Sequence, residues 1–252
     1  MKCVVTGAAG FIGSHLTRQL VADGHTVVAI DNFSIADQRL QQARKAWVEE
    51  LVPIAWCDVT DFASLEQLFT KQAFDTVFHL AAKPGVRESL ENPFIYAQAN
   101  YVGTLNVLEC ARRHGVAHTL IASSSSVYGR NDKVPFSEAD TADEPISVYA
   151  STKRAGELLA YTYHHLYDLN VTNLRFFTVY GPYGRPDMAP WIFTEKILKG
   201  EPIRIYDHGK HQRDFTFVDD IVAGCVGAAD APAGYSLLNL GNGIPVQLMD
   251  FI

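Results

Sequence analysis

A tyrosine and a lysine four residues apart, Tyr149 and Lys153, are the first residues in this sequence that could do chemistry together. They open a run with the apolar spacing of a helix, on which side chains at i and i+4 share a face. A phenol titrates near ~10 in water, and a fixed cation beside it favours the phenolate and lowers its pKa. A phenol tuned in this way can accept a proton from a ligand hydroxyl. The same spacing also occurs on solvated helices, so the rest of the sequence must show whether this pair is catalytic.

A glycine loop near the N-terminus indicates a phosphate-binding turn. The β-branched run Lys2–Thr6 stops at Gly7, and Gly10 and Gly13 follow before a helical pattern begins. Glycines let backbone N–H groups approach a pyrophosphate, and the helix N-terminus adds partial positive charge. The spacing is GxxGxxG rather than the usual GxGxxG, but the strand–turn–helix context is the one that a dinucleotide site requires.

Two aspartates stand at predicted strand ends. Asp31 ends a strand over residues 26–30, where a carboxylate can accept both ribose hydroxyls of an adenosine and repel a 2′-phosphate. No arginine follows directly in residues 32–34, which favours NAD over NADP; a turn or helix-capping aspartate is the alternative. Asp58 follows a strand over residues 52–56, within reach of an adenine amino group, and a helix-capping role is equally consistent with its position.

Small and hydroxyl-bearing residues follow two further strands. Residues 76–80 lead into a segment of small residues, 81–87, that lets the backbone approach a cofactor closely. Residues 118–122 lead into four serines, 123–126. In an open parallel sheet the strand ends are where ligands bind, so one serine hydroxyl could bond both a ligand oxygen and Tyr149. A plain loop is the alternative.

The strand–helix alternation predicts an α/β fold. We expect a Rossmann-type doubly wound parallel sheet over residues 1–175, and a smaller C-terminal substrate-binding lobe over residues 176–252, with some elements returning to pack on the first domain. After Arg175 the pattern becomes rich in Gly and Pro, with short helices near 190–199 and 218–229 and short strands near 203–206 and 237–240. The lobe carries three arginines that together suit phosphate binding, Arg185, Arg204 and Arg213.

Composition excludes several classes. A net charge of −7 argues against a general nucleic-acid surface, and we find no apolar run long enough to span a membrane and no basic-then-apolar leader. The four cysteines are scattered, which predicts reduced thiols in a cytoplasmic protein. His79 is expected in the core, and His164 and His165 point to different helix faces, so no metal site is predicted.

Six motifs carry a resemblance through the whole chain: GAAGFIG, HLAAKPGVRESL, SSSSVYG, YASTK, LRFFTVYGPYGRPDMA and RDFTFVDD. Together they resemble the extended short-chain dehydrogenase/reductase family, and within it the nucleotide-sugar epimerases, most of all the UDP-glucuronate 4-epimerases. The resemblance implies tightly held NAD, a UDP-sugar substrate and inversion at C4 through a 4-keto intermediate. It also implies a homodimer formed through a helix pair that includes the Tyr–Lys helix.

The resemblance assigns roles to individual residues. Tyr149 is the base for the 4-hydroxyl, Lys153 lowers its pKa and binds the nicotinamide ribose, and Ser124 or a neighbour orients the hydroxyl. The cofactor shell comprises Gly7, Gly10, Phe11, Ile12, Gly13, Asp31, Asn32, Phe33, Ser34, Asp58, Val59, Leu80, Ala81, Ala82, Lys83 and Asn100, with Tyr149 and Lys153. The substrate side comprises Arg87, Ser124, Ser125, Ser126, Thr178, Arg185 and Arg213.

The serine row separates related chemistries. Dehydratases of the resembled family place an Asp-Glu pair just after the Ser/Thr, and the decarboxylases place a Glu there, whereas this chain has Ser125 and Ser126. Elimination then lacks its acid and base, and a substrate carboxylate would meet hydroxyl donors. This favours epimerisation of an acid sugar, although UDP-glucose/UDP-galactose remains an alternative pair. A non-catalytic NAD-binding protein on the same fold is a further alternative.

The C-terminal lobe is expected to be truncated. Residues 239–246 resemble a strand and turn that family members follow with a helix and further segments, and only residues 247–252 follow here. We expect this to weaken the grip on the sugar nucleotide more than the grip on NAD.

Overall fold

A parallel β-sheet forms the centre of the protein. The computed structural model describes residues 1–34, 37–205, 207–209, 212–231 and 234–252. Within these residues the main sheet has seven strands in the order β3-β2-β1-β4-β5-β6-β9, each paired in parallel with its neighbours. The strands are β1 Lys2–Thr6, β2 Thr26–Asp31, β3 Ile54–Trp56, β4 Thr76–His79, β5 His118–Ser124, β6 Val171–Phe176 and β9 Tyr235–Leu240. The predicted doubly wound sheet is confirmed, and its order reverses between β1 and β4, where ligands bind in this architecture.

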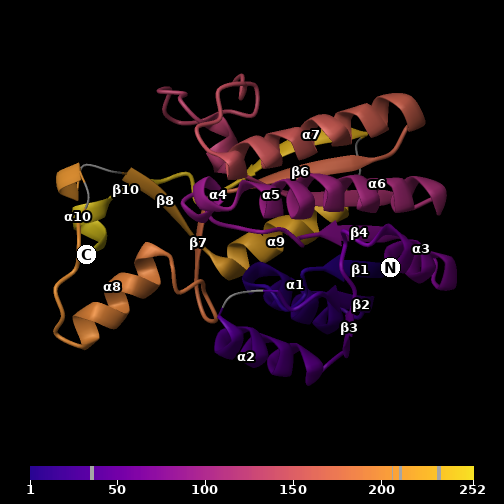
Figure 1. The fold of residues 1–252 in the computed structure, drawn as a ribbon, viewed down its shortest axis with the longest axis horizontal. Coiled ribbons are helices and arrows are strands. Elements are labelled where there is room, and N and C mark those ends of the chain that lie inside the picture. The colour runs from indigo at the N-terminus through magenta and orange to yellow at the C-terminus, as the bar shows by residue number, and fades with distance from the viewer. Residues whose placement is uncertain (35–36, 206, 210–211, 232–233) are drawn as a thin grey trace.

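Helices cover both faces of this sheet (Figure 1). One face packs on α1 Phe11–Ala22, α2 Gln38–Glu49 and α9 Val218–Ala229, and the other on α3 Phe62–Lys71, α6 Gly103–Arg113 and α7 Val148–Tyr167. Successive strand residues feed opposite cores, as Val4 and Val5 of β1 do. Burial on both faces explains why the strands read as continuous apolar runs.

The segment before α6 is one bent helical run. It comprises α4 Glu88–Glu91, α5 Pro93–Tyr96 and a π-helical stretch Ala97–Val102 that continues into α6. The π-helical stretch is a local widening of this run. Such widened turns are often found at functional sites, and this one contains Asn100.

The C-terminal residues divide between two places. A three-stranded sheet, in the order β10-β8-β7, lies beside α8 Ala189–Leu198 and α10 Leu248–Phe251. Its strands are β7 Thr178–Tyr180, β8 Gln212–Phe217 and β10 Pro245–Gln247. By contrast, α9 packs on α1, and β9 adds the last strand of the main sheet beside β6.

One predicted strand is wrong. Residues 203–205 are not a strand, and residue 206 lies outside the described residues. The alternation of Ile203 and Ile205 imitates a strand, but the strand that pairs with β7 is β8, ten residues later. Alternation alone does not supply a neighbour to pair with.

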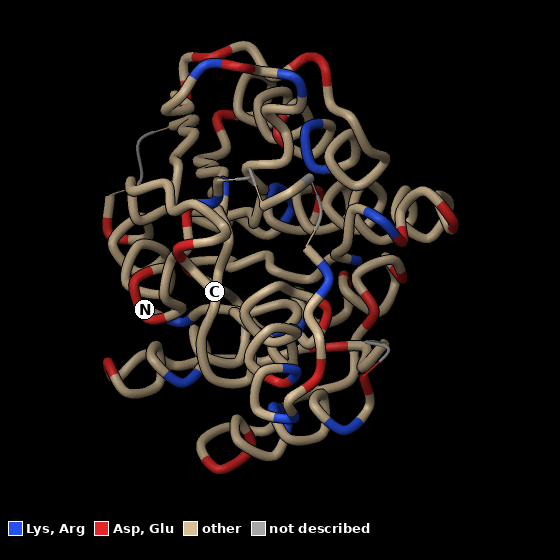
Figure 2. Tube along the Cα trace, turned by 90° about the vertical axis from the view of Figure 1, so that its left-hand side faces the viewer, with Lys and Arg blue, Asp and Glu red and all other residues tan. Residues whose placement is uncertain are grey.

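Charged residues of both signs are mixed along the chain (Figure 2). Lysine and arginine are interspersed with aspartate and glutamate along the trace (Figure 2). Among the described residues, no helix is both long and apolar enough to cross a membrane.

Candidate active site

The start of α7 places Tyr149 and Lys153 at the carboxyl end of β5. Ser147 caps the helix by accepting a hydrogen bond from the Ala150 amide at 3.1 Å. The Lys153 ammonium donates to the Ala122 carbonyl oxygen of β5 at 2.7 Å. Both side chains are half-buried, and a capped helix start fixes the direction in which they point.

The serine row is more ordered than a loop. Ser123 and Ser124 belong to β5, and Ser125–Tyr128 forms a 3₁₀ turn. The Ser124 hydroxyl oxygen accepts hydrogen bonds from the Ser126 amide at 3.2 Å and the Ser126 hydroxyl at 2.9 Å. Its proton is therefore free to face the Tyr149 phenol, where its hydrogen bond acts to lower the phenol pKa.

The net pKa shift of Tyr149 differs from the prediction. Burial raises the pKa of the phenol, and this outweighs the opposing effects of Ser124 and Arg185. Burial also lowers the pKa of Lys153 to about 8, against the attraction of Glu157. Lys153 is not among the groups that act on the Tyr149 pKa here, because its ammonium is turned to the Ala122 carbonyl. That Lys153 lowers this pKa during the reaction stays a prediction.

The glycine loop leaves room only for backbone. Gly7 has φ +73°, and a Cβ there would lie 2.7 Å from the Ala81 nitrogen. A Cβ at Gly13 would lie 2.0 Å from the Gly7 carbonyl oxygen. Both positions therefore exclude any side chain, which keeps the α1 N-terminus open to a pyrophosphate.

Asp31 ties the glycine loop to the end of β2. Its carboxylate accepts hydrogen bonds from the Ala9 amide at 2.9 Å and the Phe33 amide at 2.7 Å. Burial raises the pKa of this carboxyl, and the two amides act against that shift. Each carboxylate oxygen has a second lone pair, so these contacts leave acceptor capacity for ribose hydroxyls.

Asn32 and Asp58 join two adjacent strand ends. The Asn32 amide donates to Asp58 at 2.9 Å, and Asp58 also accepts the Thr60 amide and hydroxyl, both at 2.8 Å. Burial acts to raise the Asp58 pKa, but these hydrogen bonds outweigh it and lower the pKa. Asp58 thus caps the turn before α3, whereas the cap of that helix is Asp61, so the helix-capping alternative is wrong and the adenine contact stays a prediction.

Asn100 connects the segment after β4 to the catalytic helix. Its side-chain oxygen accepts the Lys83 amide at 2.7 Å, and its nitrogen donates to the Thr152 hydroxyl at 3.1 Å. The Lys83 ammonium pairs with Glu88 at 2.9 Å. Of the remaining predicted cofactor residues, Phe11 and Ile12 begin α1, and the others lie in segments that follow β2, β3 and β4, namely Ser34, Val59, Leu80 and Ala82.

The predicted substrate residues come from several elements. Thr178 begins β7, and Arg213 lies on β8 with its guanidinium donating to the Gln212 carbonyl at 2.8 Å. Arg87 is exposed at the start of α4. Arg185 pairs with Asp187, two residues away, at 3.0 Å.

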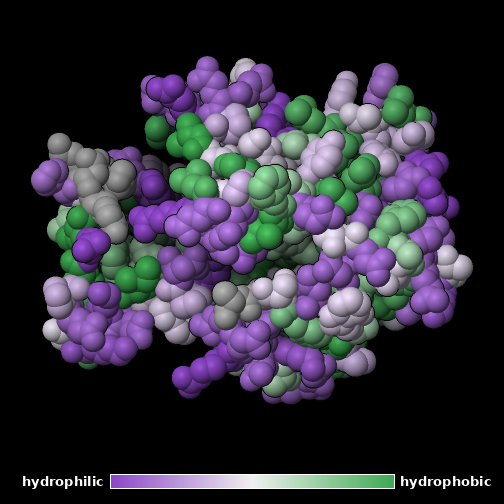
Figure 3. Space-filling model, in the orientation of Figure 1, coloured by the Kyte–Doolittle hydropathy of each residue, from purple (hydrophilic) through white to green (hydrophobic). Residues whose placement is uncertain are grey.

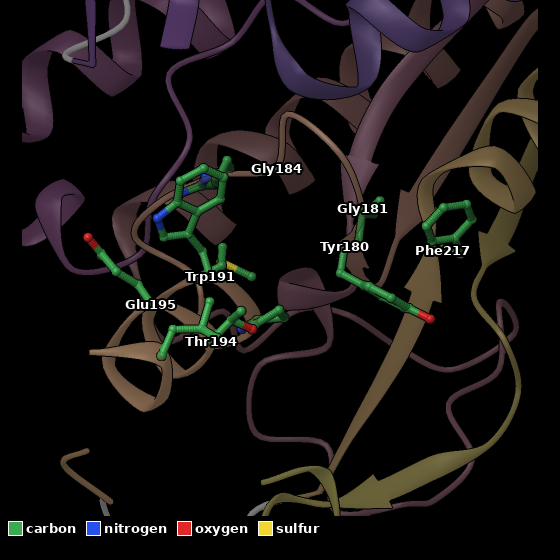
Figure 4. A pocket seen from close by; sticks show the side chains of 12 residues that line it. Tyr180, Gly181, Gly184, Trp191, Thr194, Glu195 and Phe217 are labelled. Atoms are coloured by element: carbon green, nitrogen blue, oxygen red, sulfur yellow. The ribbon is translucent and has the colours of Figure 1, made fainter. Parts of the chain in front are cut away.

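A cavity of about 550 Å³ opens in the C-terminal part between β7, β8 and α8 (Figure 4). Tyr180 and Phe217 lie on one side of it, and Trp191, Thr194 and Glu195 on the other. Arg185 lines this cavity, whereas Tyr149 and the serines do not. The cavity therefore does not include the proposed reaction centre at the end of β5.

Two groups of residues escaped the sequence analysis. Arg44 is 2% exposed and donates to the carbonyl oxygens of Tyr183 at 2.7 Å and Gly184 at 3.2 Å. Its position on the apolar face of α2, three residues from Gln41 and four from Val48, was the available signal. Glu157 pairs with Arg175 beneath α7, and its spacing of four from Lys153 was the signal there.

Comparison with known proteins adds to this geometry. The family model described as "NAD dependent epimerase/dehydratase family" matches residues 3–241. UDP-glucuronate 4-epimerase 4 of Arabidopsis thaliana is 46% identical over 99% of this chain, which spans 61% of that protein's length.

Two solved structures are similar over the whole chain. The UDP-glucuronic acid 4-epimerase of Bacillus cereus, in complex with UDP-glucuronic acid and NAD, has a TM-score of 0.88 at 35% identity, with 81% of its chain covered. The UDP-glucose 4-epimerase of Thermotoga maritima, with UDP-glucose, has a TM-score of 0.91 at 31% identity, with 80% covered.

Proposed function

Because the chain belongs to the NAD dependent epimerase/dehydratase family, we propose that it catalyses NAD-dependent epimerisation at C4 of a UDP-hexuronic acid, converting UDP-glucuronate to UDP-galacturonate. The observation that carries this is the meeting of Ser124, Tyr149 and Lys153 at the end of β5. The Arabidopsis and Bacillus cereus relatives, both named as acting on this sugar acid, support the choice of substrate.

The cofactor cradle fits NAD. Gly7 and Gly13 leave no space for a Cβ, and the carboxylate of Asp31 sits at the tip of β2. NAD, when bound, supplies the acceptor for a hydride and returns it. The chain contributes backbone amides for the pyrophosphate and the Asp31 carboxylate for the adenosine ribose.

The proton is handled by residues of α7 and β5. In our proposal the Tyr149 phenolate takes the proton of the sugar 4-hydroxyl, so that the C4 hydrogen can leave as hydride and a 4-keto sugar forms. Ser124 holds the oxygen in place, and Lys153 binds beside the nicotinamide ribose. The same phenol returns the proton after the keto sugar has presented its other face.

The substrate carboxylate is assigned to hydroxyl groups. Ser125 and Ser126 are half-buried in a row without a carboxyl group, and Thr178 begins β7. A β-keto acid loses carbon dioxide easily, so fixed hydrogen bonds must hold its carboxylate away from the geometry that permits loss. Arg87, Arg185 and Arg213 are assigned to the sugar diphosphate.

A chromatographic assay tests the function. The protein is incubated with UDP-glucuronate and, separately, with UDP-glucose, and the products are resolved as UDP-galacturonate or UDP-galactose. We expect conversion of the acid sugar. Conversion of UDP-glucose alone would favour the alternative suggested by the Thermotoga maritima likeness, and conversion of neither would favour a non-catalytic NAD-binding protein.

Thr178→Ala should raise the share of decarboxylated pentose among the products, and an unchanged share would reject the assignment of Thr178 to the substrate carboxylate.

We further propose a homodimer through α5 and α7. Apolar side chains gather over α4 and α5 (Figure 3), and Phe94 is 86% exposed. Other exposed apolar residues on α4, α5, the π-helical stretch and α7 are Leu90, Ile95, Tyr101, Leu158, Tyr161 and Leu166. A patch of this kind marks an association site. Light scattering should give twice the chain mass, and a single-chain mass would reject the proposal.

Two broader assignments complete the proposal. The four cysteines are free and buried, which supports a reducing, cytoplasmic location. Residues 1–175 would form the NAD-binding domain and residues 176–252 a substrate lobe, from which α9 and β9 return to the main sheet.

A further inference from the structure

A buried ion pair lies directly beneath the catalytic helix. The side chain of Glu157, on α7, is 0% exposed, and that of Arg175, on β6, is 1% exposed. The guanidinium donates to both carboxylate oxygens, each at 2.8 Å. Arg154 donates to the same carboxylate at 3.0 Å and reaches Asp143 at the surface. A bidentate buried pair of this kind is rigid, since breaking it would strand a charge.

The same carboxylate also holds the strand that carries the serine row. The Ser123 hydroxyl donates to Glu157 at 2.6 Å, and Ser123 directly precedes Ser124 in β5. Lys153 lies one helical turn before Glu157 and donates to Ala122, the residue before Ser123. Helix α7 is therefore fastened to β5 at two neighbouring residues, Ala122 and Ser123, immediately before Ser124.

We propose that Glu157 is a positioning residue for the reaction. It aligns the Tyr149–Lys153 face of α7 with Ser124 of β5, and its negative charge keeps the Lys153 ammonium protonated at neutral pH. The first role, the alignment half of the proposal, rests on the proposed function, because it concerns turnover. The second role, the effect on the Lys153 charge, is the charge half. The charge half concerns the protein without ligands and stands independently.

The charges around Lys153 support the second role. Burial lowers the Lys153 pKa to about 8, and Glu157 is the group that acts against this. The Lys153 ammonium keeps its charge below this pKa and loses it as the pH rises through it. Because Glu157 raises the pKa, removing Glu157 should make Lys153 lose its charge at a lower pH. His79 of β4, whose own pKa falls to about 3 by burial, is neutral at pH 7.

The other titratable groups that face this region are few and come from several elements. They are Tyr149 and Arg154 on α7, Arg175 on β6, Tyr235 on β9, Tyr96 on α5, Tyr128 in the 3₁₀ turn, Glu109 on α6, Glu88 on α4, and Arg185. Glu157 is the carboxylate that acts on Lys153 in this set.

The charge half is tested by titrating Lys153 in the ligand-free protein. Lysines are reductively methylated with ¹³C, the Lys153 signal is assigned by its loss in Lys153→Arg, and its chemical shift is followed with pH by NMR. Glu157→Gln should move the midpoint down by about one unit. Glu157→Gln combined with Arg175→Gln leaves no buried charge unpaired and should move the midpoint down by a similar amount, because Glu157 is the charged group that acts on Lys153. An unmoved midpoint in a folded Glu157→Gln protein would overturn this half.

The alignment half is tested with Ser123→Ala, which removes the link to β5 and leaves every charge in place. We expect kcat to fall about tenfold with KM and the Lys153 midpoint unchanged, because the reacting groups are misaligned and not retitrated. A wild-type kcat would overturn this half. Should Glu157→Gln alone not fold, the double variant decides the charge half, and an unmoved Lys153 midpoint in it would overturn that half. If the wild type turns over no UDP-sugar, the proposed function fails while the titration still decides the charge half.

Discussion

The edge of the main sheet formed by the carboxyl ends of its strands (the sheet edge) and the loop between β7 and α8 hold their functional side chains by different means. At the sheet edge, Lys153 and Asp31 bond to backbone groups that are 31 and 22 residues away in the chain, and Asp31 is buried. On the loop, Arg185 is 28% exposed and bonds Asp187, two residues away. Contacts between distant elements fix a geometry, whereas a local exposed ion pair contributes little and can exchange for a ligand phosphate.

Arg44 connects these two regions. It comes from α2, on the cofactor side, and grips the carbonyl oxygens of Tyr183 and Gly184 in the loop. Burial lowers its pKa to about 10, so it remains charged at neutral pH. Trp47, from the same helix, stacks on Tyr183 with ring centroids 4.8 Å apart. The loop that carries Arg185 is therefore held near its middle by side chains of α2.

The largest effect is expected at the sheet edge. Tyr149→Phe removes the phenol that accepts the proton and should lower kcat by a factor of ~100 or more, with NAD retained because the glycine loop and Asp31 are untouched. Steady-state kinetics and the absorbance of bound cofactor measure the two. Tyr167→Phe, an exposed position on the same helix, is the control. Near-normal turnover by Tyr149→Phe would remove this residue from the mechanism.

A smaller effect is expected from Asp31→Ala. It removes a charge-assisted contact with the ribose, typically ~1.5–3 kcal/mol, and should weaken NAD about tenfold to a hundredfold. It also removes the repulsion of a 2′-phosphate, so discrimination against NADP should relax. Calorimetric titration with both cofactors checks this, with Asp23→Ala as an exposed control. An unchanged NAD/NADP ratio would contradict the assignment.

The smallest effect is expected from Arg44→Leu, which tests the connection itself. Releasing the loop should raise KM for the UDP-sugar about tenfold, the typical cost of a lost charged hydrogen bond, and leave kcat within about twofold because α7 and β5 are untouched. Arg39→Leu, exposed on the same helix, should change neither. A loss confined to kcat would show that the two regions are not separable in this way.

The sequence by itself determined the sheet and the identity of the groups at its edge. The apolar runs, the glycine spacing and the Tyr149–Lys153 spacing are local patterns, and local patterns report strands, turns and helix faces directly. For the same reason residues 203–205 were mistaken for a strand, since the pattern contains no information about which strand is available to pair. The four serines show the limit of such patterns. The sequence predicted that they follow an apolar strand, but it did not predict that two of them belong to β5 and two to a 3₁₀ turn.

The tertiary structure alone decided how those groups are held and charged. Arg44 lies 139 residues from Tyr183, and Glu157 meets Ser123 across 34 residues, so neither contact has a signature in sequence spacing. The pKa of Tyr149 is raised because desolvation depends on everything packed around the phenol, whereas the sequence displayed only the nearby lysine. Spacing along a helix identifies which groups can meet, and burial, which is a property of the whole fold, decides which protonation state they then prefer.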